Sequence, residues 1–383
     1  MNTKEIGEIR RHTRRDRSNM TSIYGCYVNE NKQIISQFRR STGMMSENEG
    51  EKYFALLRRT LSGTIGKNLI DICFATSQVA NSEEHRFLMD LRKCKLEDEE
   101  IRTQFYQKVI DSVSLGENYL ILLGYECYDV PFKSKDGEND NNRSDETYAY
   151  IHCAVCPVKQ TQPKLHYVPE EKDFHDGGII NVVSAPEVGF IFPAFDNRST
   201  NIYNALYYTH SAKENHATFA DTMFRVAIPM PAFEQKKSFE ALLCTTLEED
   251  SNMDVAQTLH EQICQRIEMH KESRIAEPLT LGKEEVKTVL SSCGVSDQHL
   301  AKFSVEYDEV FGFDAQLHPK NIIDNKRFEI KTPDVSIKVA PDRTDLIQTR
   351  IIDGIKYILI CAEDDVEVNG VRIQIENKEG ALL

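Results

Sequence analysis

Apolar and aromatic side chains are densest between residues 185 and 210, where one polar cluster, residues 196–201, interrupts them. This pattern predicts two strands, at about 188–195 and 202–209, joined by a turn, because aromatic residues suit the half-buried face of a sheet. Asp, Asn and Ser side chains suit the turn, because they bond to nearby backbone groups. The side chains expected to anchor this hairpin in a sheet are Phe190, Phe192, Tyr203 and Tyr207.

Strand and helix patterns alternate through the rest of the first half. Apolar runs predict strands at residues 22–28, 33–38, 69–75, 118–128 and 147–158. Helical patterns cover residues 4–15, 82–93 and 98–113, and a further helix begins after Ser46. Residues 133–145 are polar and lack periodicity, which predicts a loop between antiparallel strands.

The second half of the chain begins with helical patterns and ends with strand patterns. Apolar residues at helical spacing cover residues 233–247, 254–271, 283–292 and 297–311. From residue 327 onward, apolar and polar positions alternate. The dipeptides Asp353-Gly354 and Asn369-Gly370 lie between strand-like runs and predict hairpins, because both favour the turns that match the twist of strands.

Together these patterns predict an α+β fold. We expect a mainly antiparallel sheet with flanking helices, a helical middle segment and a C-terminal antiparallel β meander. The corresponding domains are residues 1–225, 226–312 and 313–383. At 383 residues, of which 40% are hydrophobic, the chain is long enough to bury two or three cores.

The chain carries a formal net charge of −15. This acidity argues against a general nucleic-acid coat, because binding to phosphates needs a basic surface. The N-terminal helix is the exception, because its basic residues are close together in the sequence: Arg10, Arg11, Arg14, Arg15 and Arg17. Such a run contacts nucleic acid or an acidic partner, unless it is only a solvated helix end.

The sequence also bears on the compartment. Residues 1–17 lack the apolar core of a signal peptide, and no apolar run approaches the ~20 residues of a membrane span. The ten cysteines are scattered, and several lie in apolar patterns, which is typical of reduced thiols rather than of a disulfide framework. We therefore expect a cytoplasmic protein with no membrane partner.

Cys153 and Cys156 form a Cys-x-x-Cys motif inside a strand-like run that Pro157 closes. Redox pairs usually open a helix, where the helix dipole lowers the thiol pKa. A structural zinc needs four ligands, and only His152 and His166 are near in the sequence. We expect sheet thiols that face opposite sides of one strand, and neither a metal nor another cofactor.

The polar cluster offers the first candidate site. Arg198, Ser199, Thr200 and Asn201 would form an anion or substrate site if their side chains were turned toward a ligand. The alternative is a well-bonded turn, because these residue types bond readily to nearby backbone. We favour the turn and expect Arg198 to lie in solvent.

A second candidate lies in the C-terminal strands. Glu329 and Lys331 lie on the same face of a predicted strand, as in the Glu-x-Lys motif of metal-dependent nucleases, and Asp314 lies fifteen residues upstream. Two carboxylates would hold Mg²⁺, and Lys331 would orient the attacking water. Alternation of Lys and Glu is also ordinary on a sheet with one solvated face, and the chain continues into hairpins rather than a helix.

Distinctive segments occur along the whole chain: IYGCYVNENKQIISQF, LSGTIGKNLIDICF, NYLILLGYECYDVPFKSKDG, CPVK, SAPEVGFIFPAFDNRSTNIYNALYYT, FEIKTPDVSIKV and IDGIKYILI. Together they resemble a bacterial family of unknown function, and the resemblance covers essentially the full length of this chain. The resemblance implies a bacterial cytoplasmic protein. It brings no catalytic residue, cofactor or substrate with it.

Two functions follow from these observations. We favour a non-catalytic intracellular protein that binds a protein partner or assembles with itself, because no nucleophile–base pair, ligand set or phosphate loop emerges from the spacing of residues. Its contact surfaces would be the basic N-terminal helix, the polar loop and the aromatic hairpin, and nucleic acid would be a partner only through the basic helix. The alternative is the metal-dependent nuclease.

Overall fold

A computed structural model describes residues 1–133, 139–211, 213–273, 275, 279–313, 315–362 and 366–373. The described chain forms two units. The first unit comprises Met1–Gln235 together with Ile275, and the second comprises the other described residues from Lys236 on. Each unit has a hydrophobic core of its own, and each is described by itself below.

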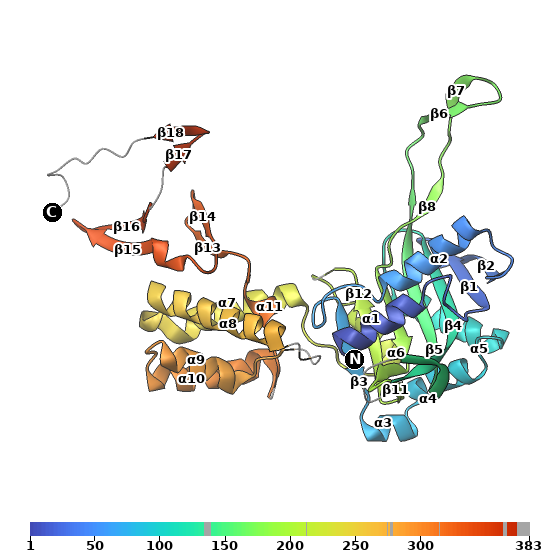
Figure 1. Cartoon of the computed structure of the whole chain (residues 1–383), viewed down its shortest axis with the longest axis horizontal. Helices are drawn as coiled ribbons and strands as arrows, with labels where there is room; N and C mark the ends of the chain where they lie inside the picture. Colours follow the sequence, from blue (N-terminus) through green and yellow to red (C-terminus); the bar gives the residue numbers. More distant parts are fainter. Residues whose placement is uncertain are drawn as a thin grey trace. The chain divides into compact units, whose positions relative to one another are not determined.

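One antiparallel sheet organises the first unit (Figure 1). Its strand order is β2-β1-β4-β5-β9-β12-β3, and an eighth strand, β8, pairs with β5 outside this order. Every pairing in it is antiparallel, as the alternating patterns predicted. The strands are β1 (Ser22–Val28), β2 (Ile34–Ser41), β3 (Leu69–Cys73), β4 (Tyr119–Lys133), β5 (Asn139–Gln160), β8 (Asn181–Val183), β9 (Val188–Phe192) and β12 (Asn204–Thr209).

Helices cover both faces of this sheet. On one face, α4 (Glu83–Lys93), α5 (Glu99–Ser112) and α6 (Ala217–Phe224) enclose the largest core, and the short α3 (Thr76–Asn81) precedes them. On the other face, α1 (Thr3–His12) and α2 (Glu47–Arg59) pack against alternate residues of the same strands. Because both faces are buried, central strands such as β9 are apolar throughout.

The two motif cysteines illustrate this alternation. Cys153 packs in the core under α4–α6, and Cys156 packs in the core under α2. Both side chains are buried, and both thiols are free. The prediction that they face opposite sides of one strand is therefore confirmed.

The predicted pairing of the two aromatic strands is confirmed, but the segment that joins them and the place of Tyr203 differ from the prediction. Phe190 in β9 lies opposite Tyr207 in β12, and both rings are buried. The polar cluster forms a second, smaller hairpin between them, made of β10 (Ala194–Asp196) and β11 (Ser199–Asn201). The expectation that Tyr203 anchors the sheet is wrong: it lies in the turn after β11, and 43% of its surface is exposed.

The second unit contains the predicted helices and then strand pairs. Its core is formed by apolar side chains of helices and of the short segments that join them. The helices are α7 (Ala232–Leu247), which belongs to this unit from Lys236 on, α8 (Met253–Ser273), α9 (Lys283–Ser292), α10 (Asp297–Phe311) and α11 (Pro319–Ile322). The antiparallel strand pairs are β13 (Phe328–Lys331) with β14 (Ser336–Val339), β15 (Ile347–Ile352) with β16 (Ile355–Ile360), and β17 (Val366–Val368) with β18 (Val371–Ile373).

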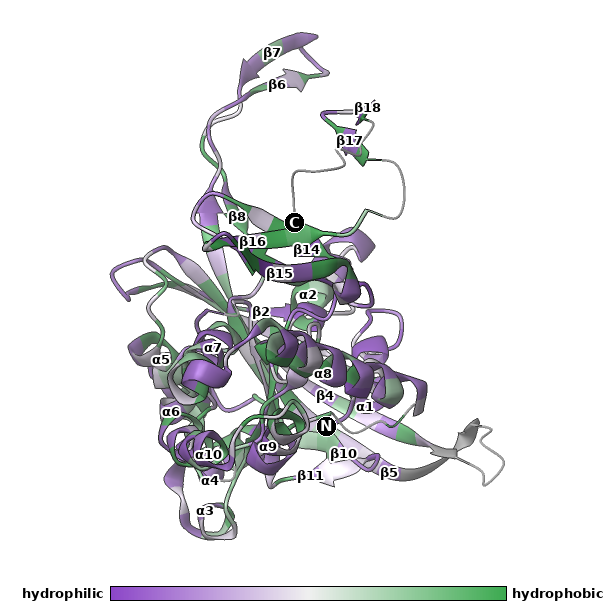
Figure 2. Ribbon diagram, turned by 90° about the vertical axis from the view of Figure 1, so that its left-hand side faces the viewer, coloured by the Kyte–Doolittle hydropathy of each residue, from purple (hydrophilic) through white to green (hydrophobic). Residues whose placement is uncertain are grey.

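The fold is therefore α+β, with a large antiparallel sheet, helices in the middle and antiparallel strand pairs at the C-terminal end. A further strand pair, β6 (Leu165–Val168) with β7 (Asp173–Asp176), lies in the first unit. The β15–β16 pair carries hydrophobic residues, green in Figure 2, and Ile351, Ile355 and Ile360 are exposed there. Among the described residues, no helix is long and apolar enough to span a membrane.

Candidate functional site

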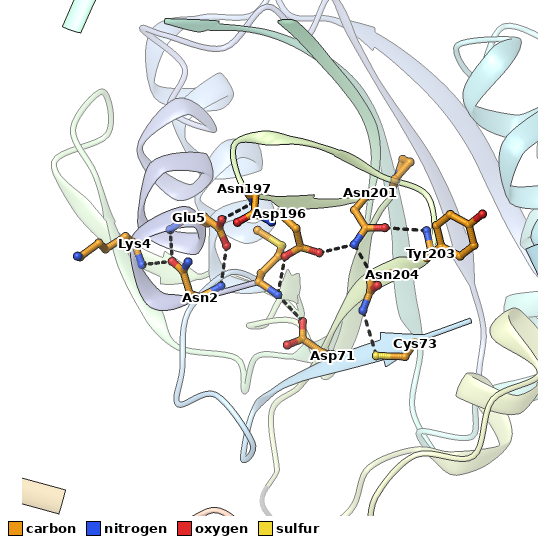
Figure 3. A network of polar contacts seen from close by, with 12 residues as sticks. Asn2, Lys4, Glu5, Asp71, Cys73, Asp196, Asn197, Asn201, Tyr203 and Asn204 are labelled. Carbon is orange, nitrogen blue, oxygen red and sulfur yellow. Dashed lines mark hydrogen bonds and ion pairs between the residues drawn. The ribbon is translucent and has the colours of Figure 1, made fainter. Parts of the chain in front are cut away.

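Local sequence explains how α1 presents its basic residues. The Asn2 side chain accepts hydrogen bonds from the backbone of Lys4 and Glu5, and the Glu5 carboxylate accepts one from the Asn2 backbone, which completes a capping box (Figure 3). Ile6 and Ile9 lie in the core. Because these apolar residues fix the buried side of the helix, the arginines of its last turn face outward, where positive charge also complements the helix dipole.

Arg198 from the β10–β11 turn contacts α1 instead of solvent. One of its terminal nitrogens donates to both carboxylate oxygens of Glu8, at 2.7 and 2.6 Å, and the other donates to the carbonyl oxygen of Pro131 at 2.6 Å. The exposed fractions of the Arg198 and Glu8 side chains are 23% and 17%. The expectation that Arg198 lies in solvent is therefore wrong. Its partner on α1 is 190 positions away in the sequence, so no local pattern reveals the contact.

Ser199 and Thr200 of this turn bond to one carboxylate. The Ser199 hydroxyl and the Thr200 backbone N–H both donate to Oε1 of Glu146, at 2.9 Å each. These two bonds, that of the Thr200 backbone first, hold the pKa of Glu146 below its usual value. Both residues thus contribute to the bonding of the turn.

Asn201 is bonded within the cluster itself. Its amide nitrogen donates to Asp196 and Asn204, and its amide oxygen accepts from the backbone of Tyr203 (Figure 3). Asn197 donates its backbone N–H to Glu5, which ties the cluster to α1. The cluster is a well-bonded turn, as favoured, and a ligand-binding role for Arg198, Ser199, Thr200 and Asn201 stays a prediction.

Arginines supply five of the eight residues that line a hollow beside α1 and α2. Its volume is about 460 Å³, and we call it the arginine hollow. Arg58 pairs with Glu51 at 2.6 Å, and Glu51 is the one carboxylate in the lining. The lining residues are Arg10, Arg11, Arg14, Glu51, Ala55, Arg58, Arg59 and Ser62. Five guanidinium groups therefore face a hollow that holds one carboxylate.

A second cavity of about 290 Å³ shares Arg11 with the arginine hollow. We call it the histidine pocket. The Tyr128 hydroxyl donates to Glu8 at 2.9 Å, and the rings of Tyr128 and His12 lie with centroids 4.2 Å apart. Burial, and then the Glu8 carboxylate, raise the pKa of Tyr128, so its hydroxyl stays protonated. The lining residues are Glu8, Arg11, His12, Arg17, Tyr128, Pro131 and Arg198.

Glu126, two residues before Tyr128 in β4, is fully buried behind this pocket. It accepts hydrogen bonds from the Ser18 hydroxyl and, at 2.9 Å, from the Asn19 backbone. Nε2 of His12 lies 3.4 Å from Oε1 of Glu126. A buried carboxylate needs such partners, because it has lost its hydration. The arrangement holds the imidazole ring with Nε2 turned inward.

One comparison with known proteins gives a match. A family model described as a domain of unknown function, DUF4317, covers residues 1–371. The chain belongs to this family. No curated protein and no solved structure matches it. The resemblance to a family of unknown function is confirmed, and its assignment to bacteria stays a prediction.

Four residues of this DUF4317 chain, namely Glu8, His12, Glu126 and Tyr128, were not predicted as site residues. Glu8 and His12 are four positions apart on a helix, and Glu126 and Tyr128 are two apart on a strand. Each spacing places its two side chains on one face. The spacing does not show that the helix face and the strand face meet, because that contact depends on how the helix packs on the sheet.

The residues of the nuclease hypothesis lie in the second unit. Lys331 pairs with Glu329 at 3.3 Å on β13, and Lys338 of β14 approaches the same carboxylate at 3.5 Å. Asp314 lies outside the described residues. The described part of the chain contains no group of three or more His, Cys, Asp or Glu residues placed to hold a metal ion. The convergence of Asp314, Glu329 and Lys331 stays a prediction.

Proposed function

We propose that the chain is a non-catalytic intracellular binding protein whose arginine hollow recognises an acidic segment of a protein partner. The observation that supports this proposal is the concentration of five arginines around one hollow in a chain with a net charge of −15. The five arginines repel one another, and negative charge from a bound partner would offset that repulsion. The acidic remainder of the surface would repel anions that approach the protein away from the hollow.

The residue type also favours carboxylate recognition. Arginine presents planar, forked donors that match carboxylate and phosphate oxygens in pairs. Arg10, Arg11, Arg14 and Arg59 are exposed, and Arg14 also pairs with the exposed Asp16 at 3.2 Å, so their outward donors can reach a partner. Between the two kinds of anion, the net charge favours a short acidic segment, because an extended nucleic acid would also face the acidic remainder of the surface.

Fluorescence anisotropy tests this proposal. A labelled oligoglutamate peptide and a labelled oligouridylate are titrated with the wild-type chain and with an Arg10→Gln/Arg14→Gln double variant. We expect the wild type to bind the peptide more tightly, and the variant to lose about tenfold or more of that affinity. The matched control is Lys326→Gln/Arg327→Gln, which removes the same charge from exposed positions in the second unit.

Two results would contradict the proposal. One is equal affinity of the wild type and the Arg10→Gln/Arg14→Gln variant for the peptide. The other is tighter binding of oligouridylate, which would make nucleic acid the partner. Light scattering of the pure protein tests self-assembly separately: a second copy offers an acidic surface, so an oligomer that dissociates in the same variant would identify the chain itself as the partner.

A further inference from the structure

The histidine pocket contains groups that the proposed function does not use. We propose that it is a separate binding site for the phosphate group of a phosphomonoester, held by Nδ1–H of His12 and by the guanidinium groups of Arg11 and Arg17. This inference goes beyond the arginine hollow and stands on the geometry around His12.

The orientation of the imidazole ring is the first step. Nε2 is buried, lies 3.4 Å from Oε1 of Glu126 and forms no hydrogen bond within the described part of the chain. No hydrogen bond joins Nδ1 to the described residues either, so this nitrogen is left for the pocket that His12 lines. A histidine carries an N–H at Nδ1 in its imidazolium form and in one of its two neutral tautomers.

The charges around the ring are the second step. Glu8 is balanced by Arg198, which donates to both of its oxygens, and it also accepts from Tyr128. Glu126 is fully buried, its Oε1 lies 3.4 Å from Nε2 of His12, and it does not line the pocket. The groups left to face a ligand are therefore cationic donors.

Arg11 and Arg17 supply those donors. Both side chains are exposed and line the pocket. Arg17 has one ion pair in the described chain, with its neighbour Asp16, and the two atoms are 3.9 Å apart. Two guanidinium groups and the Nδ1–H of His12 suit a dianion with several oxygens, because each donor forms a hydrogen bond to a separate oxygen of a charged group. A phosphomonoester supplies that charge on a group small enough for a cavity of about 290 Å³.

Calorimetric titration with inorganic phosphate tests the site in the full chain. We expect wild-type binding at about pH 6, and a loss of about tenfold or more in the His12→Gln and Arg17→Gln variants. His175→Gln is the matched control, because His175 also pairs with a carboxylate, Glu171, but lies on the β6–β7 hairpin. Its affinity should equal that of the wild type.

Inorganic sulfate is a second probe, because it is a dianion with four oxygens and tests whether the site recognises the charge and shape of the group rather than phosphate alone. The wild type should bind sulfate, and the His12→Gln variant should lose about tenfold or more of that affinity.

The inference is overturned if the wild type binds neither anion, or if His12→Gln leaves the affinity for both unchanged. Circular dichroism checks that each variant is folded. Arg17→Gln keeps the His12–Glu126 pair intact, so it tests the site even if His12→Gln does not fold. Arg10→Gln/Arg14→Gln should keep its phosphate affinity, which separates a failure of this site from a failure of the arginine hollow.

Discussion

Replacement of Arg198 by alanine is the sharpest test of how the polar cluster works. The variant removes the two bonds to Glu8 and the bond to the Pro131 carbonyl, and leaves Glu8 with the Tyr128 hydroxyl. Loss of one partner costs ~3–5 kcal/mol for a fully buried ion pair and ~0.2–1 kcal/mol for an exposed one. Because Arg198 and Glu8 are 23% and 17% exposed, we expect a loss of about 2–3 kcal/mol in the free energy of unfolding.

Arg39 provides a matched control for this variant. It also forms two hydrogen bonds to one carboxylate, that of Glu97, at 2.9 and 2.8 Å. Those two side chains are 53% and 54% exposed, so solvent screens the pair, and Arg39→Ala should cost no more than about 1 kcal/mol. Both arginines donate two hydrogen bonds to one carboxylate, although Arg39 uses its two terminal nitrogens and also donates from Nε to Ser22 at 3.1 Å. The main difference between the two pairs is burial.

Urea unfolding followed by far-UV circular dichroism measures both losses, since the chain contains no tryptophan. Glu8→Gln added to Arg198→Ala should recover part of the loss, because it removes the stranded carboxylate charge. The reasoning is refuted if Arg198→Ala costs no more than Arg39→Ala, or if the added Glu8→Gln deepens the loss. The first result would mean that Arg198 behaves as an ordinary surface residue, and the second that its loss does not strand the Glu8 charge.

Three further predictions concern the core, the thiols and pH. Phe192→Ala should cost ~3–5 kcal/mol in a urea melt, because its ring is fully buried, and a loss below about 1 kcal/mol would contradict this. Burial raises the pKa of Cys153 well above its usual value and that of Cys156 to about 12, so mass spectrometry should find both unlabelled by iodoacetamide in the native chain while exposed thiols react. Hydrogen bonds from the Ser296 backbone N–H and then from His299 lower the pKa of Asp250 to about 2. The ionised Asp250 therefore stabilises the fold above about pH 4, and this contribution is lost as the pH falls toward 2. Urea melts at low pH should show that the Asp250→Asn variant loses less stability between about pH 4 and pH 2 than the wild type.

Much of the fold follows from short-range patterns. The Asp353-Gly354 and Asn369-Gly370 turns are where the sequence predicted them, with positive φ at all four residues. Such turns depend on the conformational freedom of two residues, so they are visible locally. Ser46 begins α2 as expected, because its hydroxyl accepts the Glu49 backbone N–H within the same turn.

The candidate sites were predicted less completely than the fold. The basic residues of α1 stood out because they are adjacent in the sequence, yet Arg58 and Arg59, which complete the arginine hollow, lie on another helix. The sequence predicts a solvated Arg198, because nothing near Arg198 in the sequence reveals its partner Glu8. Pattern reasoning identifies the residue types that a site needs, but it does not show which of them meet.

By itself, the sequence determined most of the elements of this protein: the long helices, the central antiparallel strands and the Asp-Gly and Asn-Gly turns. These features depend on hydrogen bonds and side-chain periodicity over a few residues. Only the tertiary structure decided that α1 packs beside β4 and the β10–β11 turn, which brings His12 to Glu126 and Glu8 to Arg198. The physical reason is that the order of strands in a sheet and the burial of a helix on it depend on the whole core, and a contact between distant residues exists only once that core has formed.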